Sequence, residues 1–129
     1  MQKQVELNGV KMQSHERDSI LRLRKLGFDA RPIKPSGVMG TPDVMIGNQL
    51  WEIKTPDGGS RKSTIENQFS RAKKQSIYLV IDCVRLKLPD DFAVRETARQ
   101  LRFPVIKHSI KQVKIITKAL EVIDITKKA

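Results

Sequence analysis

The hydrophobic and polar positions divide the chain into helical and extended segments that follow one another closely. Apolar residues recur at helical spacing in three segments, which predict helices at about residues 14–26, 63–75 and 90–101. Ser14 is the expected N-cap of the first helix, and Gly27 is the residue expected to end it. Ser63 and Glu66 have capping-box spacing and predict the start of the second helix.

Apolar runs rich in β-branched residues predict the strands between these helices. The run from Ile77 to Val84 is almost continuously apolar, as is typical of a central strand covered on both faces. Shorter runs predict strands at residues 28–33, on both sides of Gly47-Asn48, and in a closing hairpin of residues 113–117 and 122–125. This order of elements predicts an α/β (α+β) fold with a central mixed sheet flanked by helices.

The pair Gly47-Asn48 predicts a tight hairpin between two short apolar runs. Gly-Asn favours a two-residue type II′ turn, because glycine supplies the positive φ at the first central position. With this turn, Asp43 lies directly opposite Glu52, and the Cβ atoms of the two acids are about 4.5 to 5.5 Å apart. Like charges at that distance destabilise the pair or raise the pKa of one acid, so a compensating group is expected. The same register pairs Val44 with Trp51, Met45 with Leu50, and Ile46 with Gln49.

Lys54 is expected to lie beside these two acids. Side chains alternate between the two faces of a strand, so Glu52 and Lys54 share one face of the second hairpin strand. Trp51 and Ile53 then point to the other face, toward the core. Asp43, Glu52 and Lys54 are therefore expected to converge.

Glu16 in the first helix is expected to approach the same place. On a helical wheel it lies within about 60° of Ile20 and Leu23, which belong to the inward apolar stripe, whereas Asp18 points to the far side. Three carboxylates and a lysine form a site suited to Mg²⁺ or Mn²⁺ and a water molecule. Such a site favours phosphodiester hydrolysis, because the metal polarises a phosphoryl oxygen and the lysine stabilises developing charge.

Each of these residues also has an ordinary structural interpretation. Asp43 follows Pro42 and could begin a strand or cap a turn. Glu52 and Lys54 could form the solvated face of an edge hairpin. Glu16 could simply stabilise the positive end of its helix. The hairpin register and the helical phase of Glu16 are separate constraints that agree, and their agreement favours the metal site.

Composition and charge narrow the class of partner. The 129 residues are 39% hydrophobic and predict one domain, with a core at about residues 14–84 and a C-terminal helix and hairpin at about 89–126. The formal charge of +11 and the pI of about 10.1 favour a polyanionic partner, above all nucleic acid. The longest apolar run is too short to span a bilayer, and the first residues lack the apolar core of a signal peptide, so no membrane anchor is expected.

The loop before the second helix supplies the candidate nucleic-acid-binding residues. Arg61 and Lys62 precede a helix N-terminus whose free N–H groups suit a phosphate, and Ser63 and Thr64 begin that helix. The glycines before them also fit a flexible solvated loop, and both interpretations stay open.

Four other residues are assigned structural roles. Cys83 lies within an apolar run and is expected to be a small buried hydrophobe. His15 and His108 have no Cys or His partners at metal-ligand spacing, so zinc is not expected. Asp82 interrupts the same apolar run and is expected to be a hydrogen-bonded strand residue.

Pro42-Asp43 and Glu52-Ile53-Lys54 resemble the two halves of the motif of the PD-(D/E)xK nuclease superfamily. Together with Glu16, the segments RDSILRLRKLGFDARPI, TPDVMIGNQLWEIKTPDGGSRKSTIENQFSRAKKQS and YLVID resemble the C-terminal tRNA nuclease domains of CdiA-type contact-dependent growth-inhibition toxins. The resemblance implies an αβββαβ core and metal-dependent cleavage of RNA. It also implies an immunity protein that blocks the toxin in its producer, and the basic charge suggests that this protein is acidic.

The resemblance further implies roles for individual residues. The catalytic set would be Glu16, Asp43, Glu52 and Lys54. The Mg²⁺ or Mn²⁺ ion would be held by Asp43, Glu52 and the backbone carbonyl of Ile53, with Glu16 acting through water. A delivered toxin domain would act in the cytoplasm of the target cell, and any other role is also expected to be cytoplasmic. A DNA endonuclease or resolvase on the same scaffold and a non-catalytic basic nucleic-acid-binding module remain alternatives.

Overall fold

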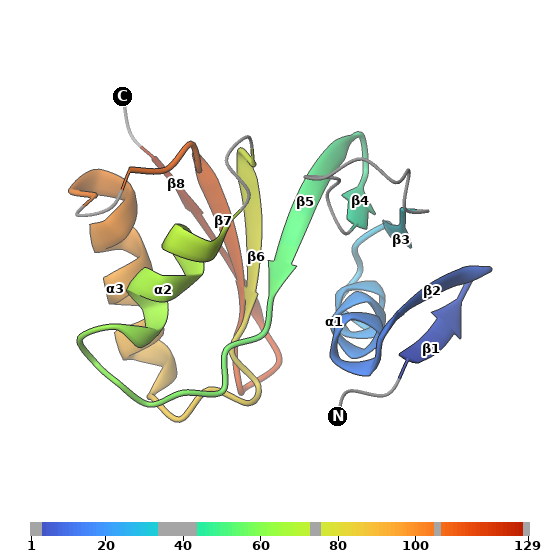
Figure 1. Ribbon diagram of the computed structural model, residues 1–129, viewed down its shortest axis with the longest axis horizontal. Coiled ribbons are helices and arrows are strands. Elements are labelled where there is room, and N and C mark those ends of the chain that lie inside the picture. Colours follow the sequence, from blue (N-terminus) through green and yellow to red (C-terminus); the bar gives the residue numbers. More distant parts are fainter. Residues whose placement is uncertain (1–3, 34–43, 73–75, 105–106, 128–129) are drawn as a thin grey trace.

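The centre of the fold is a six-stranded sheet with helices on both faces (Figure 1). The computed structural model describes residues 4–33, 44–72, 76–104 and 107–127. The elements in chain order are β1 (Gln4–Leu7), β2 (Val10–Gln13), α1 (Ser14–Lys25), β3 (Ala30–Pro32), β4 (Val44–Ile46), β5 (Gln49–Lys54), α2 (Thr64–Arg71), β6 (Tyr78–Asp82), α3 (Asp90–Arg102), β7 (Gln112–Ile116) and β8 (Val122–Thr126).

Two crossover connections give the sheet its mixed character. The strand order is β3-β4-β5-β6-β7-β8. The three central strands β5, β6 and β7 are parallel and are joined through α2 and α3, whereas the outer pairs are antiparallel. The predicted α+β fold with a mixed sheet is confirmed, and so is the closing hairpin, which is β7–β8. The series α1-β3-β4-β5-α2-β6 also has the expected αβββαβ order.

The β4–β5 hairpin has the register that its turn predicts. Gly47 has a φ of +60°, as the first central position of a type II′ turn requires. Since register decides which side chains share a face, this hairpin sets the direction of Glu52. The observed pairs are Val44 with Trp51, Met45 with Leu50, and Ile46 with Gln49.

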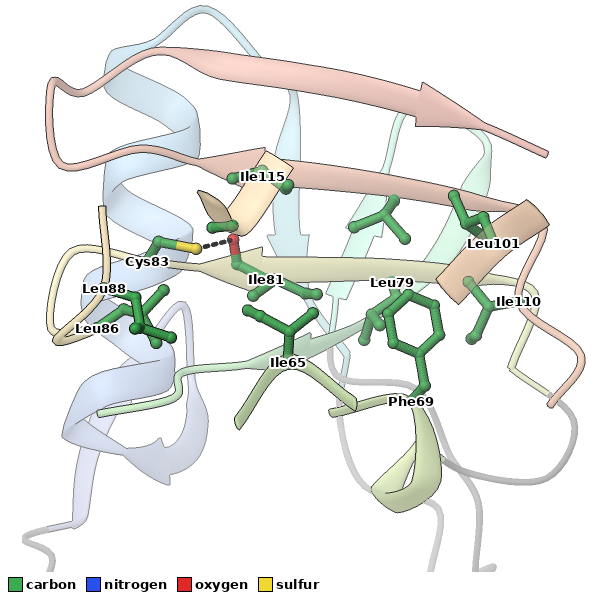
Figure 2. Packing of buried hydrophobic residues seen from close by; sticks show 12 residues of the cluster. Ile65, Phe69, Leu79, Ile81, Cys83, Leu86, Leu88, Leu101, Ile110 and Ile115 are labelled. Carbon is green, nitrogen blue, oxygen red and sulfur yellow. Dashed lines mark hydrogen bonds between the residues drawn. The ribbon is translucent and has the colours of Figure 1, made fainter. Parts of the chain in front are cut away.

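Alternation along the central strand divides the core into two layers. Leu79 and Ile81 of β6 face α2, where they pack with Ile65 and Phe69 in the cluster drawn in Figure 2. Val80 lies between them and belongs to the opposite cluster, which includes the apolar stripe of α1. Burial of β6 on both faces confirms the expected central strand.

A buried carboxylate joins α1 to the central strand. Asp82 ends β6 and is only 2% exposed. Its Oδ2 accepts hydrogen bonds from the Ser19 hydroxyl at 2.5 Å and from the Arg22 guanidinium at 2.6 Å. Its Oδ1 accepts a third from the Val84 N–H at 3.0 Å. A buried charge is tolerated when it is paired and hydrogen-bonded in this way, and the role expected for Asp82 is confirmed.

The N-terminal hairpin β1–β2 was not expected from the hydrophobic pattern. Its turn is Asn8-Gly9, and both residues have positive φ, as a type I′ turn requires. The Asn-Gly pair is therefore the sequence signal that identifies this hairpin. Val5, Leu7 and Val10 of the hairpin pack against the α1 side of the core.

Gly27 ends α1 with a positive φ, as expected, but the N-terminal caps differ from the prediction in their details. Gln13, rather than Ser14, is the N-cap residue of α1, because β2 runs directly into the helix and keeps Gln13 extended. Ser63 is the N-cap of α2 but makes no capping bond, and its hydroxyl donates to the Ser60 hydroxyl at 2.9 Å instead. The helix ends at Arg71 because Ala72 has extended dihedral angles.

Cys83 is buried in the part of the core that lies under α2, as expected. Its side chain is fully buried, and its Sγ lies 3.9 Å from the Ile81 carbonyl oxygen (Figure 2). Burial, with a smaller contribution from the negative charge of Asp82, raises the pKa of the Cys83 thiol to about 12. The thiol is therefore protonated and unreactive in the folded protein.

The Asp82 network gives a prediction about stability. Asp82→Ala leaves the Ser19 hydroxyl and the Arg22 guanidinium without their buried partner, and we expect it to lower the free energy of unfolding by about 3 kcal/mol. Asp29→Ala is the control, because Asp29 is 70% exposed and its loss costs less than about 1 kcal/mol. Urea denaturation measures both changes, and equal effects would contradict a special role for Asp82.

Candidate functional site

A cavity of about 530 Å³ opens beside the C-terminal half of β5. Its walls come from the first turn of α1, the end of β5, the loop that follows β5, and α2. The carboxyl end of a parallel strand is a common place for a ligand site in an α/β sheet. The residues around the cavity are His15, Glu16, Glu52, Ile53, Lys54, Thr55, Pro56, Asp57, Gly58, Thr64, Asn67, Gln68 and Arg71.

Glu52 is the most buried charged group of this cavity. It is 1% exposed, and its carboxylate contacts Ser76 and Lys54. The Ser76 hydroxyl donates to Oε1 at 2.7 Å, and the Lys54 ammonium lies 3.1 Å from Oε2. Because the ammonium offsets the buried negative charge and the hydroxyl limits rotation of the carboxylate, Glu52 is held in one orientation.

Glu16 and Lys54 lie at the same cavity, as the sequence predicts. Glu16 is half-buried in the first turn of α1, while Ile20 and Leu23 of the same helix are almost completely buried. The Lys54 side chain is 26% exposed, so its ammonium can reach a ligand in the cavity. Ile53 also borders the cavity, and its side chain is buried on the α1 side of the sheet.

Asp43 lies outside the described residues. The confirmed register of β4 and β5 is the one from which we expect Asp43 opposite Glu52. Within the described part of the chain, no group of three or more His, Cys, Asp or Glu side chains could hold a metal ion. Three of the four predicted catalytic residues, Glu16, Glu52 and Lys54, are thus brought together at one cavity, and the fourth remains a prediction.

Of the four predicted nucleic-acid-binding residues, only Thr64 lines the cavity. The Arg61 guanidinium instead lies 4.8 Å from the ring centre of Phe92, over α3. The glycine loop before it is held in place, since the Lys87 N–H donates to the Gly58 carbonyl at 2.9 Å. Arg61, Lys62 and Ser63 therefore lie beside the cavity wall rather than in it.

Three polar residues of α2 line the cavity without having been assigned a role from the sequence. Asn67, Gln68 and Arg71 follow Thr64 at spacings of three, four and seven residues, which place all four on one helix face. This polar stripe was the signal that could have identified them. Arg71 adds a second cation to the cavity beside Lys54.

The two histidines have different surroundings. His15 borders the cavity. His108 lies elsewhere, and its ring accepts a hydrogen bond from the Ile110 N–H at 3.1 Å and contacts the Gln100 carbonyl oxygen at 3.2 Å. Both ring nitrogens of His108 are thus engaged by the backbone, so this histidine has a structural role.

Comparison with known proteins identifies the family. The model of the contact-dependent growth inhibition CdiA C-terminal domain matches residues 40–122. The chain therefore belongs to the CdiA C-terminal domain family. No curated protein matches the chain. Within the described residues, the helices are too short and too polar to cross a membrane.

A solved structure has a similar fold. It belongs to a CdiA-CT/CdiI toxin and immunity complex from Burkholderia pseudomallei, with a TM-score of 0.67 and 18% sequence identity. The similarity covers 98% of this chain and 97% of that chain. At this identity the likeness shows a shared fold, which extends over nearly the whole of both chains.

The Ser76 hydroxyl gives a prediction about the site itself. Ser76→Ala removes a hydrogen bond to a buried carboxylate, and we expect it to lower the free energy of unfolding by about 1.5 kcal/mol. Ser70→Ala is the matched control, since the exposed Ser70 hydroxyl donates only to the Asn67 carbonyl of its own helix and its loss should cost less than about 0.5 kcal/mol. Urea denaturation compares the two, and a smaller effect at Ser76 would mean that its hydroxyl does not support Glu52.

Proposed function

We propose that this CdiA C-terminal domain is a toxic effector that cleaves RNA, with tRNA as its main substrate, by metal-dependent hydrolysis of phosphodiester bonds. The observation that carries the proposal is the convergence of Glu16, Glu52 and Lys54 at one cavity. The spacing of Asp43, Glu52 and Lys54 and the element order around them also support membership of the PD-(D/E)xK superfamily.

The donor set fits a hard divalent cation. Glu52 presents a buried and oriented carboxylate, and Glu16 adds a second carboxylate at the same cavity. Asp43, Glu52 and the Ile53 carbonyl would hold Mg²⁺ or Mn²⁺, with Glu16 acting through water, since both ions prefer oxygen ligands. When bound, the ion would polarise a phosphoryl oxygen and lower the pKa of a bound water.

The chain's own cations act on the phosphate. Lys54 is held 3.1 Å from Glu52 and presents a compact ammonium to the cavity, where it orients the attacking water and stabilises negative charge on the phosphoryl group. Arg71 lines the same cavity from α2 and can bind a phosphate oxygen next to the cleaved bond. Ser76 keeps the Glu52 carboxylate in its orientation during these steps.

The helices favour RNA over duplex DNA as the substrate. A helix that reads the major groove directs its N-terminal residues at the bases. Here each helix carries acids in its first turn, Glu16 in α1, Glu66 in α2, and Asp90 and Asp91 in α3. A helix that entered the major groove by this end would bring negative charge between the two phosphate backbones. A folded RNA offers single-stranded bases and irregular phosphate spacing to a basic cavity.

The proposed partners and site of action follow from the family. The similar structure is a complex of a toxin with an immunity protein, and a protein of that kind would protect the producing cell from this domain. Because this chain carries a charge of +11, an acidic immunity protein would associate quickly and cover the basic cavity. The proposed site of action is the cytoplasm of the target cell, where tRNA is found.

Metal binding is tested by thermal unfolding with and without Mn²⁺. A ligand that binds only the folded state stabilises it by about 2.7 kcal/mol at one hundred times its Kd, so we expect Mn²⁺ to raise the Tm of the wild type. Asp43→Ala and Glu52→Gln should abolish this rise. Asp57→Ala is the control, because Asp57 also borders the cavity but pairs with Arg85 at 3.0 Å, and this variant should keep the rise. An equal rise in all variants would place the metal elsewhere.

Cleavage is tested with deproteinised tRNA, total RNA and supercoiled plasmid in Mg²⁺. We expect discrete tRNA fragments from the wild type, and a loss of at least about 100-fold in rate for Lys54→Ala. Lys54→Arg keeps the positive charge beside Glu52 but replaces the compact ammonium with a planar guanidinium. We therefore expect this variant to fold but to be inactive.

Circular dichroism of both Lys54 variants separates loss of chemistry from loss of folding. Nicked plasmid with intact tRNA would favour a DNA endonuclease. Binding of nucleic acid without any metal-dependent product would favour a non-catalytic module.

A further inference from the structure

A second concave surface lies on the other side of α2 from the cavity. A hollow of about 340 Å³ is formed by the last turn of α2 and residues 107–110. It adjoins a hollow of about 380 Å³ formed by residues 108–111 with Ile77 and Lys127. The two hollows share three lining residues, His108, Ser109 and Ile110. We call the two hollows together the basic groove.

Neighbouring residues at the end of α2 line the cavity and the basic groove. Arg71 lines the cavity, whereas its neighbours Ser70 and Ala72 line the basic groove. A polynucleotide that leaves the cavity past Arg71 therefore meets the basic groove as it crosses the end of the helix.

The charges of the basic groove suit a phosphate backbone. Its described lining includes three exposed lysines, Lys107, Lys111 and Lys127, and no carboxylate. The cavity differs in this respect, because Glu16, Glu52 and Asp57 line it. The basic groove can thus bind phosphates along its whole length without repulsion from an acid of its own walls.

The floor of the basic groove suits a base. Phe69 and Ile110 belong to the buried apolar cluster of Figure 2, and the His108 ring lies 4.9 Å from the Phe69 ring. Because the Ile110 N–H donates to Nδ1 of His108, the ring proton lies on Nε2, which donates to the Gln100 carbonyl. The ring is therefore fixed in orientation, and because it is partly exposed and lines both hollows, it can stack with a base.

We propose that the basic groove binds the single-stranded RNA segment next to the bond that is cleaved, with phosphates on Lys107, Lys111 and Lys127 and a base against His108. This inference rests on the proposed nuclease function and names the path of its substrate. It explains how a small domain holds a long polyanion at a cavity whose own walls carry three acids.

Charge neutralisation with a matched control tests the basic groove. The groove variant is K107Q/K111Q. The control K25Q/R102Q removes the same charge at exposed positions that line neither the cavity nor the groove. Binding of a labelled single-stranded RNA of about twelve nucleotides is measured by fluorescence anisotropy with a chelator present, so that no cleavage occurs.

We expect the groove variant to bind about tenfold more weakly than the control, with the slope of log affinity against log salt reduced by about 1.4 for two lost phosphate contacts. Equal affinities of the two variants would overturn the proposal. An equal loss of affinity for duplex DNA would also overturn it, because the site would then not be specific for a single strand.

A small substrate separates this inference from the proposed function. Bis(p-nitrophenyl) phosphate occupies only the cavity, so in Mn²⁺ the groove variant should hydrolyse it at the wild-type rate. A reduced rate would show that the lysines act on the cavity and would overturn the assignment to the groove. If the wild type forms no metal-dependent product from tRNA or total RNA, the nuclease proposal fails, while the RNA-binding comparison still decides whether the groove binds a single strand.

Discussion

The carboxylate of Asp82 is the interaction on which the geometry of the site depends. It is buried at the end of the central strand and accepts hydrogen bonds from Ser19 and Arg22, both on α1. These bonds set the rotation and depth of α1 on the sheet, and Glu16 lies only one turn before Ser19. A polar contact specifies one arrangement more strictly than apolar packing, which tolerates sliding. The position of Glu16 relative to β5 is therefore set by the buried contact between α1 and Asp82.

The second constraint is the alternation of β5 side chains between the two faces of the sheet. Trp51 and Glu52 are consecutive and both 1% exposed, yet one belongs to the apolar layer under α1 and the other faces the polar stripe of α2. A strand covered on both faces would ordinarily be apolar throughout. The presence of an acid and a lysine on one face costs stability, and their mutual contact and the Ser76 hydroxyl help to offset this cost. Such a local departure from the pattern of a core is characteristic of functional positions.

The extent to which the sequence predicts this structure depends on how local the determining interactions are. The Gly47-Asn48 turn sets the hairpin register, and helical phase places Glu16, so both follow from short-range geometry. Ser76 could not be identified in this way, because its contact with Glu52 joins residues 24 positions apart. The predicted N-cap of α1 was also wrong by one position, since the strand β2 continues into the helix without a loop. The position of Asp43 stays a prediction.

The burial of Cys83 has a consequence for how the folding of this domain can be followed. It is the chain's single cysteine, and its thiol is both inaccessible and protonated in the folded state. Alkylating or disulfide-exchanging reagents require an exposed thiolate, so they can label the chain only when the layer beneath α2 opens. The labelling rate in native buffer then reports the population of that opened state directly. The domain thus carries a built-in reporter of its own opening, which needs neither an added probe nor an assay of activity.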